Sequence, residues 1–239
     1  MSWINFLLVA GLAATAGAIV QSGVGLGLGL VAAPVVTLLF PEMMPGSLLI
    51  AAAVLPLLVL AGEAREADWA GLRWAFVGRL AGTPAGIWVV ATLPDRALGL
   101  AVGAMVLVAV AVTGLSARVP RNRGTLIGAG LMAGAAGTAT SIGGPPIALL
   151  YQRESGPRVR ATLSIFFTVG ALLSVLTLAA VDELPARQVA GGLALTPFVI
   201  AGFAVSGPFR RYLDRDHTRG AILAVTATSA LVLIIRNML

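Results

Sequence analysis

The sequence contains no cysteine, no lysine and a single histidine, and charged residues make up only 11% of it. Without cysteine there can be no disulfides, no thiol redox chemistry and no cysteine-ligated metal. A soluble domain carries about 25% charged residues, so this chain has too few to cover a water-facing surface. The composition therefore excludes an ordinary soluble domain and predicts a protein that faces lipid.

What the chain has instead is apolar sequence: 58% of its 239 residues are hydrophobic, and its mean hydropathy is +0.96. Apolar runs of about 20 residues recur, which is the length of helix that crosses roughly 30 Å of hydrocarbon. The connections between them are too short to hold a soluble domain. The pattern predicts an all-α, polytopic membrane helical bundle with apolar stretches at 4–40, 46–62, 74–93, 97–115, 124–151, 161–181, 188–206 and 221–235.

Two of these stretches are interrupted. The first is nearly twice as long as one crossing requires and contains QSGVGLGLGL, followed by Pro34. The fifth contains TSIGGPP, in which Pro145 and Pro146 remove two amide donors and obstruct a continuous helix. Both are predicted to be helix–break–helix units, and the sequence leaves open whether they are full hairpins or re-entrant half-helices.

An internal repeat supports this interpretation. AGAIVQSGVG resembles AGAAGTATSIGG, which aligns Ser22 with Ser141, and LAGTP at 80–84 resembles LALTP at 193–197. We therefore predict two repeats, residues 1–117 and 118–239, within a single membrane domain. Each has a broken helix or hairpin plus three spans, giving 8–10 membrane segments in all.

The arginines predict the orientation of the two repeats. If each interrupted stretch enters and returns, only Arg96, Arg187 and Arg236 fall on one face. Apart from Arg79, the other twelve arginines then share the opposite face, as cytoplasmic loops should. This parity makes the repeats inverted and places both termini outside the cytoplasm.

The two breaks are the predicted substrate site, because inverted-repeat transporters bind their substrates where helices break near the membrane midplane. Helix starts inside the membrane suit anions, and glycines allow a close approach of the backbone. The alternative is that the glycines only permit tight helix packing. The candidate residues at the breaks are Gln21, Ser22, Gly23, Gly25, Thr140, Ser141, Gly143, Gly144 and Pro145.

Three further candidates lie within predicted spans. Arg79 is the one charge clearly inside a span, so it is either a functional cation or a side chain that reaches back to the interface. Thr83 and Thr196 each precede a proline at equivalent places in the two halves. For both threonines the sequence favours a structural kink over a contribution to the site.

Other functions lack the residues that they require. No Asp, Glu or His lies convincingly inside a span, so an intramembrane protease and a metal site are not expected. There is no phosphate-binding GxxxxGK[ST] motif. The arginines lie in short loops between apolar runs and indicate topology, not nucleic-acid binding. We expect neither an enzyme nor a cofactor.

The glycine-rich QSGVGLGLGLVAAP and its counterpart TSIGGPPIALLY, with the duplicated halves, resemble the sulfite exporter TauE/SafE family of membrane permeases. The resemblance implies a secondary transporter in the bacterial inner membrane that exports sulfite or an organosulfonate such as sulfoacetate by alternating access. The partners are then a small anion and the lipid bilayer, while a coupling ion and a homo-oligomer are left open. The alternative is a channel-like or structural membrane protein.

Overall fold

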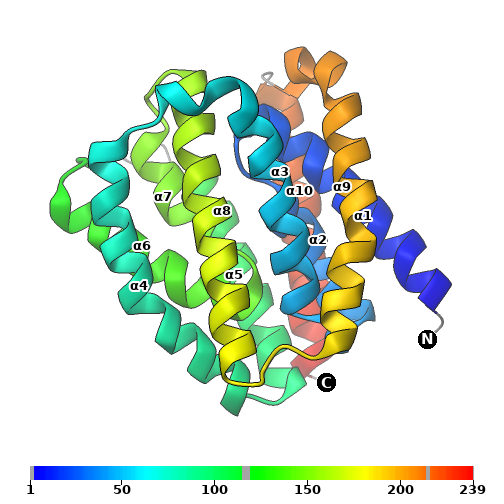
Figure 1. The fold of residues 1–239 in the computed structure, drawn as a ribbon. Helices are drawn as coiled ribbons and strands as arrows, with labels where there is room; N and C mark the ends of the chain where they lie inside the picture. The colour runs from blue at the N-terminus through cyan, green and yellow to red at the C-terminus, as the bar shows by residue number, and fades with distance from the viewer. Residues whose placement is uncertain (1–2, 115–118, 214–215, 239) are drawn as a thin grey trace.

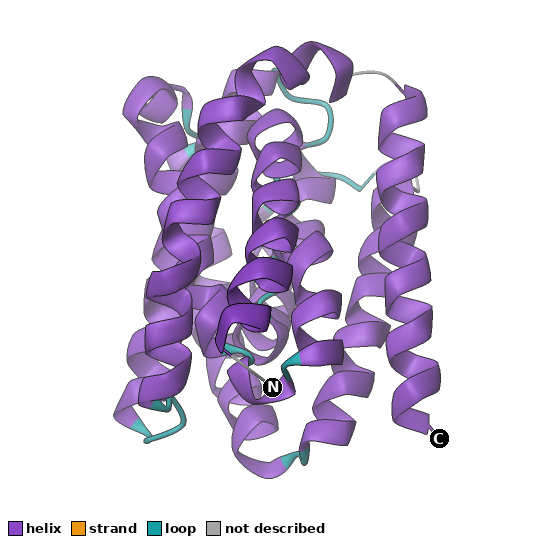
Figure 2. Ribbon diagram, turned by 90° about the vertical axis from the view of Figure 1, so that its right-hand side faces the viewer, coloured by secondary structure: helices purple, strands orange, loops and turns teal. Residues whose placement is uncertain are grey.

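The computed structural model of the chain describes residues 3–114, 119–213 and 216–238. Within these ranges helices are the only regular secondary structure (Figure 2), which confirms the predicted all-α class. The helices are α1 Trp3–Val24, α2 Leu28–Leu39, α3 Gly46–Glu63, α4 Trp69–Thr92, α5 Asp95–Gly114, α6 Arg123–Thr140, α7 Gly144–Tyr151, α8 Gly156–Ala180, α9 Ala186–Leu213 and α10 Asp216–Met238, with 3₁₀ helices η1 Pro41–Met43 and η2 Ala64–Glu66.

Among the described residues, three helical segments are long and apolar enough to cross a membrane by length and composition: Trp3–Gly23, Gly156–Ala180 and Ala186–Gly207. Shorter apolar helical segments are Leu28–Leu39, Gly46–Leu60, Arg96–Val108 and Ala227–Met238. Large hydrophobic side chains point outward on many of the helices, as for Leu12 and Leu176, which are each 67% exposed. Such exposure suits a lipid environment, because lipid tails are as apolar as leucine side chains.

Both interrupted stretches are broken where the sequence predicts. The first helix ends at Val24 and the next begins at Leu28, with Gly25 between them in the left-handed region at φ 87°. The second break separates α6 from α7, which has only eight residues. At 1.5 Å per residue, α2 and α7 are about 18 and 12 Å long, too short to cross the hydrocarbon alone.

Successive helices run in alternating directions, and both chain ends lie toward the same end of the bundle (Figure 1). Arg96, Arg187 and Arg236 are at that end: Arg96 donates to the carbonyls of residues 237 and 238, and Arg187 pairs with Glu42. At the opposite end, Arg121 and Arg158 pair with acidic side chains. The inverted symmetry of the halves, and the side of the membrane that each end faces, stay predictions.

Helices α4 and α6 make the most extensive helix–helix contact. Its cause is a small residue at every fourth position. A Cβ added to Gly78 would overlap the carbonyl of Ile127, and one added to Gly82 would overlap that of Leu131 one turn later. Gly130 of α6 meets the backbone of α4 in the same way. The two backbones therefore touch without intervening side chains, as small-xxx-small motifs permit in membranes.

Buried hydrophobic side chains form two clusters. One draws on α1, α2, α3, α5, α9 and α10, and the other on α4, α6, α7 and α8. Each cluster takes helices from both predicted repeats, so the repeats interleave in the core. Phe167 packs against both clusters, and the candidate site lies beside it.

Candidate functional site

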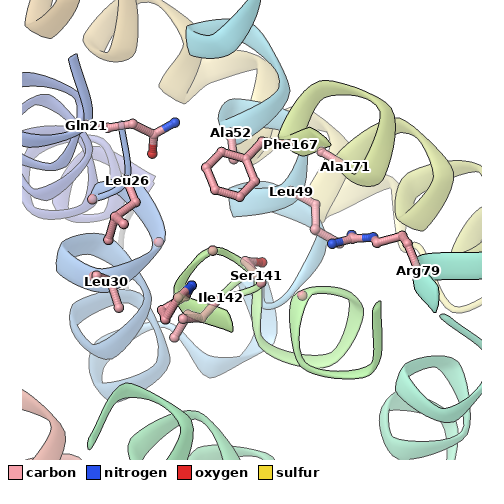
Figure 3. A pocket seen from close by; sticks show the side chains of 16 residues that line it. Gln21, Leu26, Leu30, Leu49, Ala52, Arg79, Ser141, Ile142, Phe167 and Ala171 are labelled. Atoms are coloured by element: carbon pink, nitrogen blue, oxygen red, sulfur yellow. The ribbon is translucent and has the colours of Figure 1, made fainter. Parts of the chain in front are cut away.

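A cavity of about 60 Å³ lies between the two broken helices (Figure 3). By the same measure a water molecule needs roughly 10–15 Å³, so the cavity holds about four to six waters or one small polyatomic ion. Both breaks contribute to its wall, and so do α3, α4 and α8. Its lining consists of Gln21, Leu26, Gly27, Gly29, Leu30, Leu49, Ala52, Arg79, Gly137, Ser141, Ile142, Gly143, Gly144, Pro145, Phe167 and Ala171.

Arg79 reaches this cavity from the middle of α4. Its side chain is 3% exposed, so it does not extend back to the membrane surface, and the inward alternative is the one that the structure shows. Nη1 donates to the carbonyl of Ala133 at 2.9 Å, and Nη2 donates to the carbonyl of Gly170 at 2.8 Å and to Oγ of Ser174 at 3.0 Å. These bonds fix the plane of the guanidinium against α6 and α8.

Glycines on three elements make room for this arginine. A Cβ on Gly170 would lie 2.6 Å from Cζ of Arg79, and a Cβ on either Gly137 or Gly143 would lie 2.9 Å from Nη1. Real Cβ atoms essentially never come within 3.0 Å of a neighbour, so any larger residue at Gly170 would displace the guanidinium. Gly143, predicted to admit a ligand, is therefore also required to admit Arg79.

The positive charge of Arg79 has no counter-ion among the described side chains, because none of their carboxylates forms an ion pair with it. A guanidinium has five N–H donors, and the structure occupies three of them with neutral acceptors. Nε is buried and has no partner. A buried charge without a counter-ion is strongly unfavourable, so this site favours an anion in the adjoining cavity.

Two buried hydroxyl groups, those of Ser174 and Thr138, support the guanidinium of Arg79. Oγ of Ser174, which accepts from Arg79, lies 2.8 Å from Oγ1 of Thr138 and also donates to the carbonyl of Gly170 at 2.9 Å. Sequence reasoning missed both residues. Nothing in their local sequence separates them from the other hydroxyl residues of these helices.

At the first break, Gln21 serves the backbone and the cavity together. Its Oε1 accepts from the amide of Leu28 at 3.0 Å, which caps the start of α2. The remainder of the carboxamide, with its NH₂ donors, points toward the cavity (Figure 3). The neighbouring Ser22 does not line the cavity: its hydroxyl donates to the carbonyl of Ala18 at 2.7 Å, within its own helix.

At the second break, Ser141 takes the left-handed conformation at φ 61° and ends α6. Its hydroxyl donates to the carbonyl of Pro45 at 3.0 Å, which ties the break to the start of α3. Thr140 donates to the carbonyl of Ala136 and accepts from the amide of Ile142 at 3.3 Å. The break is thus held by hydrogen bonds of its own side chains.

The structure brings half of the predicted site residues to the cavity: Gln21, Arg79, Ser141, Gly143, Gly144 and Pro145. The others lie outside its lining: Ser22, Gly23, Gly25, Thr83, Thr140 and Thr196. Thr83 and Thr196 each donate to a carbonyl four residues earlier in their own helix. The apolar part of the wall, formed by residues such as Leu26 and Phe167, carries no sequence signal in a chain that is hydrophobic throughout.

An ion cluster lies at one end of the bundle, around the starts of α4 and α6, the end of α7 and the start of α8. Tyr151, the last residue of α7, donates to Asp68 at 2.9 Å. Arg121 pairs with Glu154 at 2.6 Å and lies 3.9 Å from Asp68. Arg158 lies within 3.7 Å of both acidic side chains. The cluster therefore fastens the end of the short helix α7 to the start of α4.

The pKa of Asp68 is lowered from its ordinary value of 3.8. Burial acts to raise this pKa, but the amide of Gly71, the hydroxyl of Tyr151 and the two nearby arginines together outweigh it. Asp68 also caps the start of α4 through that amide, at 3.1 Å. The carboxylate is therefore ionised wherever the protein is folded near neutral pH.

The described residues contain no group of three or more His, Asp or Glu side chains that could hold a metal ion. The site chemistry is that of a buried cation beside amide and hydroxyl donors. Such a site can bind and release an anion.

Comparison with known proteins gives the context for this site. A search of curated proteins and a search of solved structures each found no match. The family model described as "Sulfite exporter TauE/SafE" matches residues 8–233, nearly the whole chain. The chain therefore belongs to the sulfite exporter TauE/SafE family, whose members are multi-pass membrane transporters of sulfur-containing anions and not enzymes.

Proposed function

We propose that this protein is a secondary transporter of the bacterial inner membrane that exports sulfite or a small organosulfonate by alternating access. The observation that carries the proposal is Arg79, a buried cation without a described counter-ion at the wall of a small cavity between two broken helices. Membership of a family of sulfur-anion transporters agrees with this chemistry.

The donors around the cavity suit a sulfur oxyanion. The guanidinium of Arg79 points toward the cavity from one side, and the carboxamide of Gln21 approaches from the other (Figure 3). Bonds to a charged acceptor contribute about 1.5–3 kcal/mol each. The rest of the wall is largely apolar, and low polarity strengthens the attraction between Arg79 and an anion.

Alternating access is supported by the position of the cavity. Helices α4, α6, α7 and α8 form one hydrophobic cluster, and Arg79 lies on α4, while the other cluster contains α1 and α2 with the first break and also Ile142 of the second break. A small movement between the two clusters opens or closes the space between the breaks, as in transporters that rock one bundle against another.

The competing proposal is a channel-like or structural protein in which the breaks only pack helices. One observation favours it in part: a Cβ on Gly29 would lie 2.5 Å from the carbonyl of Ser141, so this glycine brings the two breaks into direct contact. Packing alone, however, gives no reason for a buried arginine without a counter-ion. Saturable, substrate-specific anion flux separates the two proposals, because it is expected of a transporter and not of a channel-like or structural protein.

The test is anion flux by the purified protein in liposomes, with sulfite, sulfate, sulfoacetate and taurine as competing substrates. Arg79→Gln removes the charge and should reduce sulfite flux at least about tenfold, since one lost charged bond exceeds 1.4 kcal/mol. The matched control is Arg73→Gln on the same helix, where the arginine is exposed and stacks 5.4 Å from the ring of Trp74.

Both variants should stay folded, because Arg79→Gln removes a buried unpaired charge and Arg73 lies at the surface. Thermal unfolding in detergent checks this. Saturable sulfite flux that survives Arg79→Gln in a folded protein would reject the proposed site.

A further inference from the structure

We infer that the cavity selects anions with a single negative charge, so that its substrate is the monoanion of sulfite or a simple alkanesulfonate, in preference to a dianion. This inference rests on the proposed function and specifies the substrate class of the same site. It comes from the charges that surround the cavity and from the size of the space.

The formal charge of the site is plus one. Arg79 is the only charged side chain in the described lining, and no described carboxylate pairs with it. Ser174, Ala133 and Gly170 accept its hydrogen bonds as neutral groups. A bound anion therefore meets one full positive charge and no negative one.

The helix ends at the two breaks leave this value nearly unchanged. A helix start carries about half a positive charge and a helix end about half a negative charge. Each break brings one of each kind: α1 ends and α2 starts at the first, and α6 ends and α7 starts at the second. Their contributions oppose one another. In addition, Pro145 and Pro146 deprive the start of α7 of two amide donors.

A monoanion therefore makes the occupied site neutral, whereas a dianion leaves one negative charge unpaired. Leu26, Leu30 and Phe167 form part of the wall, and among such groups an uncompensated charge is strongly disfavoured. Neutrality also matters for transport, because a neutral occupied site leaves no net charge buried among apolar groups when the cavity is closed to both sides.

The volume of the cavity also favours a small anion with a single charge. Room for about four to six waters accommodates one sulfur atom with its oxygens. It is well below the roughly 300–1,000 Å³ of pockets that enclose drug-sized ligands. Sulfoacetate carries a carboxylate in addition to its sulfonate, so it is both larger and doubly charged, and it should compete more weakly than sulfite.

The experiment compares methanesulfonate with sulfate as competitors of labelled sulfite flux in liposomes. The two are tetrahedral sulfur anions of similar size, and a methyl group in place of one oxygen makes methanesulfonate a monoanion. Methanesulfonate should inhibit at least about tenfold more effectively than sulfate, a difference of about 1.4 kcal/mol. Sulfate that inhibits as well as methanesulfonate overturns the charge selectivity.

The pH dependence is a second measurement on the same protein. As the pH rises through the second ionisation of sulfite, the monoanion is converted to the dianion, so the apparent affinity for total sulfite should fall. Methanesulfonate does not titrate in this range, so its inhibition constant should stay the same. This comparison separates an effect of pH on the substrate from an effect on the protein. Equal affinity for sulfite on both sides of this ionisation contradicts the inference.

A second positive charge in the cavity should change the preference. Gln21→Lys adds one, and Gln21→Met is its control, since both variants lose the cap on Leu28 and only one gains a charge. Relative to Gln21→Met, Gln21→Lys should move the inhibition ratio about tenfold or more toward sulfate. An unchanged ratio in two folded variants refutes the charge-matching basis.

The outcomes also separate this inference from the proposed function. If sulfate and methanesulfonate inhibit saturable sulfite flux equally, the protein is still an anion transporter and only the charge selectivity is wrong. If sulfite flux is not saturable and no anion inhibits it, the proposed function is wrong.

Discussion

Replacing Gly170 by alanine tests directly whether the position of Arg79 determines anion binding. The new Cβ would lie 2.6 Å from Cζ and 2.8 Å from Nε of Arg79, so the guanidinium must retreat by about 1 Å to restore ordinary contact distances near 3.5–4.0 Å. That displacement lengthens the bonds from Nη2 to the carbonyl of Gly170 and to Ser174, which are now 2.8 and 3.0 Å long.

The expected magnitude follows from these contacts. Overpacking costs about 1–3 kcal/mol, and alanine recovers about 0.5–1 kcal/mol of helix propensity. The variant should therefore be destabilised by about 0–2.5 kcal/mol. Anion affinity should fall more steeply, by about tenfold or more, because the arginine donors no longer meet the anion at hydrogen-bond distance.

The assay is thermal unfolding of the purified protein with and without sulfite, together with flux in liposomes. Gly128→Ala is the matched control: Gly128 lies within α6, is exposed and has no atom within 4 Å of an added Cβ. It should bind sulfite as the parent does. If Gly170→Ala binds sulfite as tightly as Gly128→Ala and is equally stable, the argument about the position of Arg79 is refuted.

The second break, the ion cluster and the chain ends give four further expectations. Ser141→Gly should keep the fold because glycine accepts φ 61°, whereas Ser141→Val should lose about 1–3 kcal/mol in thermal unfolding; equal stability of the two would contradict the role of this backbone angle. Tyr151→Phe removes the bond to Asp68 and should destabilise the protein by about 1–2 kcal/mol, and a melting temperature unchanged from the parent would show that the bond contributes nothing. Because the pKa of Asp68 is lowered on folding, its contribution to stability is complete above its ordinary pKa of 3.8 and is lost as the pH falls through the lower folded value; Asp68→Asn should remove this part of the acid dependence, and an unchanged acid transition would exclude Asp68 as its source. A reporter that fluoresces only in the cytoplasm, fused after Leu239, should stay dark, and bright fluorescence would reverse the predicted orientation.

The positions of the breaks could be predicted because they depend on local chemistry. Pro145 and Pro146 cannot continue a helix from α6, and the alternating glycines before Leu28 favour a break in the same way. These effects act within a few residues of the chain, so no knowledge of the neighbours is required. The same holds for the apolar spans, whose length is set by the membrane.

The direction of Arg79 could not be predicted, because it depends on other helices. A glycine at 170 in α8 and one at 137 in α6 leave the space that the guanidinium occupies, and their sequence distances from Arg79 carry no information about that proximity. Ser22 shows the converse. It matches Ser141 in the repeat, yet its hydroxyl bonds its own helix while that of Ser141 reaches Pro45.

The contact between α4 and α6 limits how this protein can move. Its glycines meet facing carbonyls once per turn. If one helix slid along the other by less than a full turn of about 5.4 Å, backbone atoms of the two helices would overlap. If the protein works by alternating access as proposed, Arg79 on α4 and the second break at the end of α6 should therefore move together, and the change of access should involve the elements of the first break. Because the chain has no cysteine, pairs of introduced cysteines can carry distance probes without background. Probe distances between α4 and α6 should stay constant when sulfite is added, while those from α6 to α2 change.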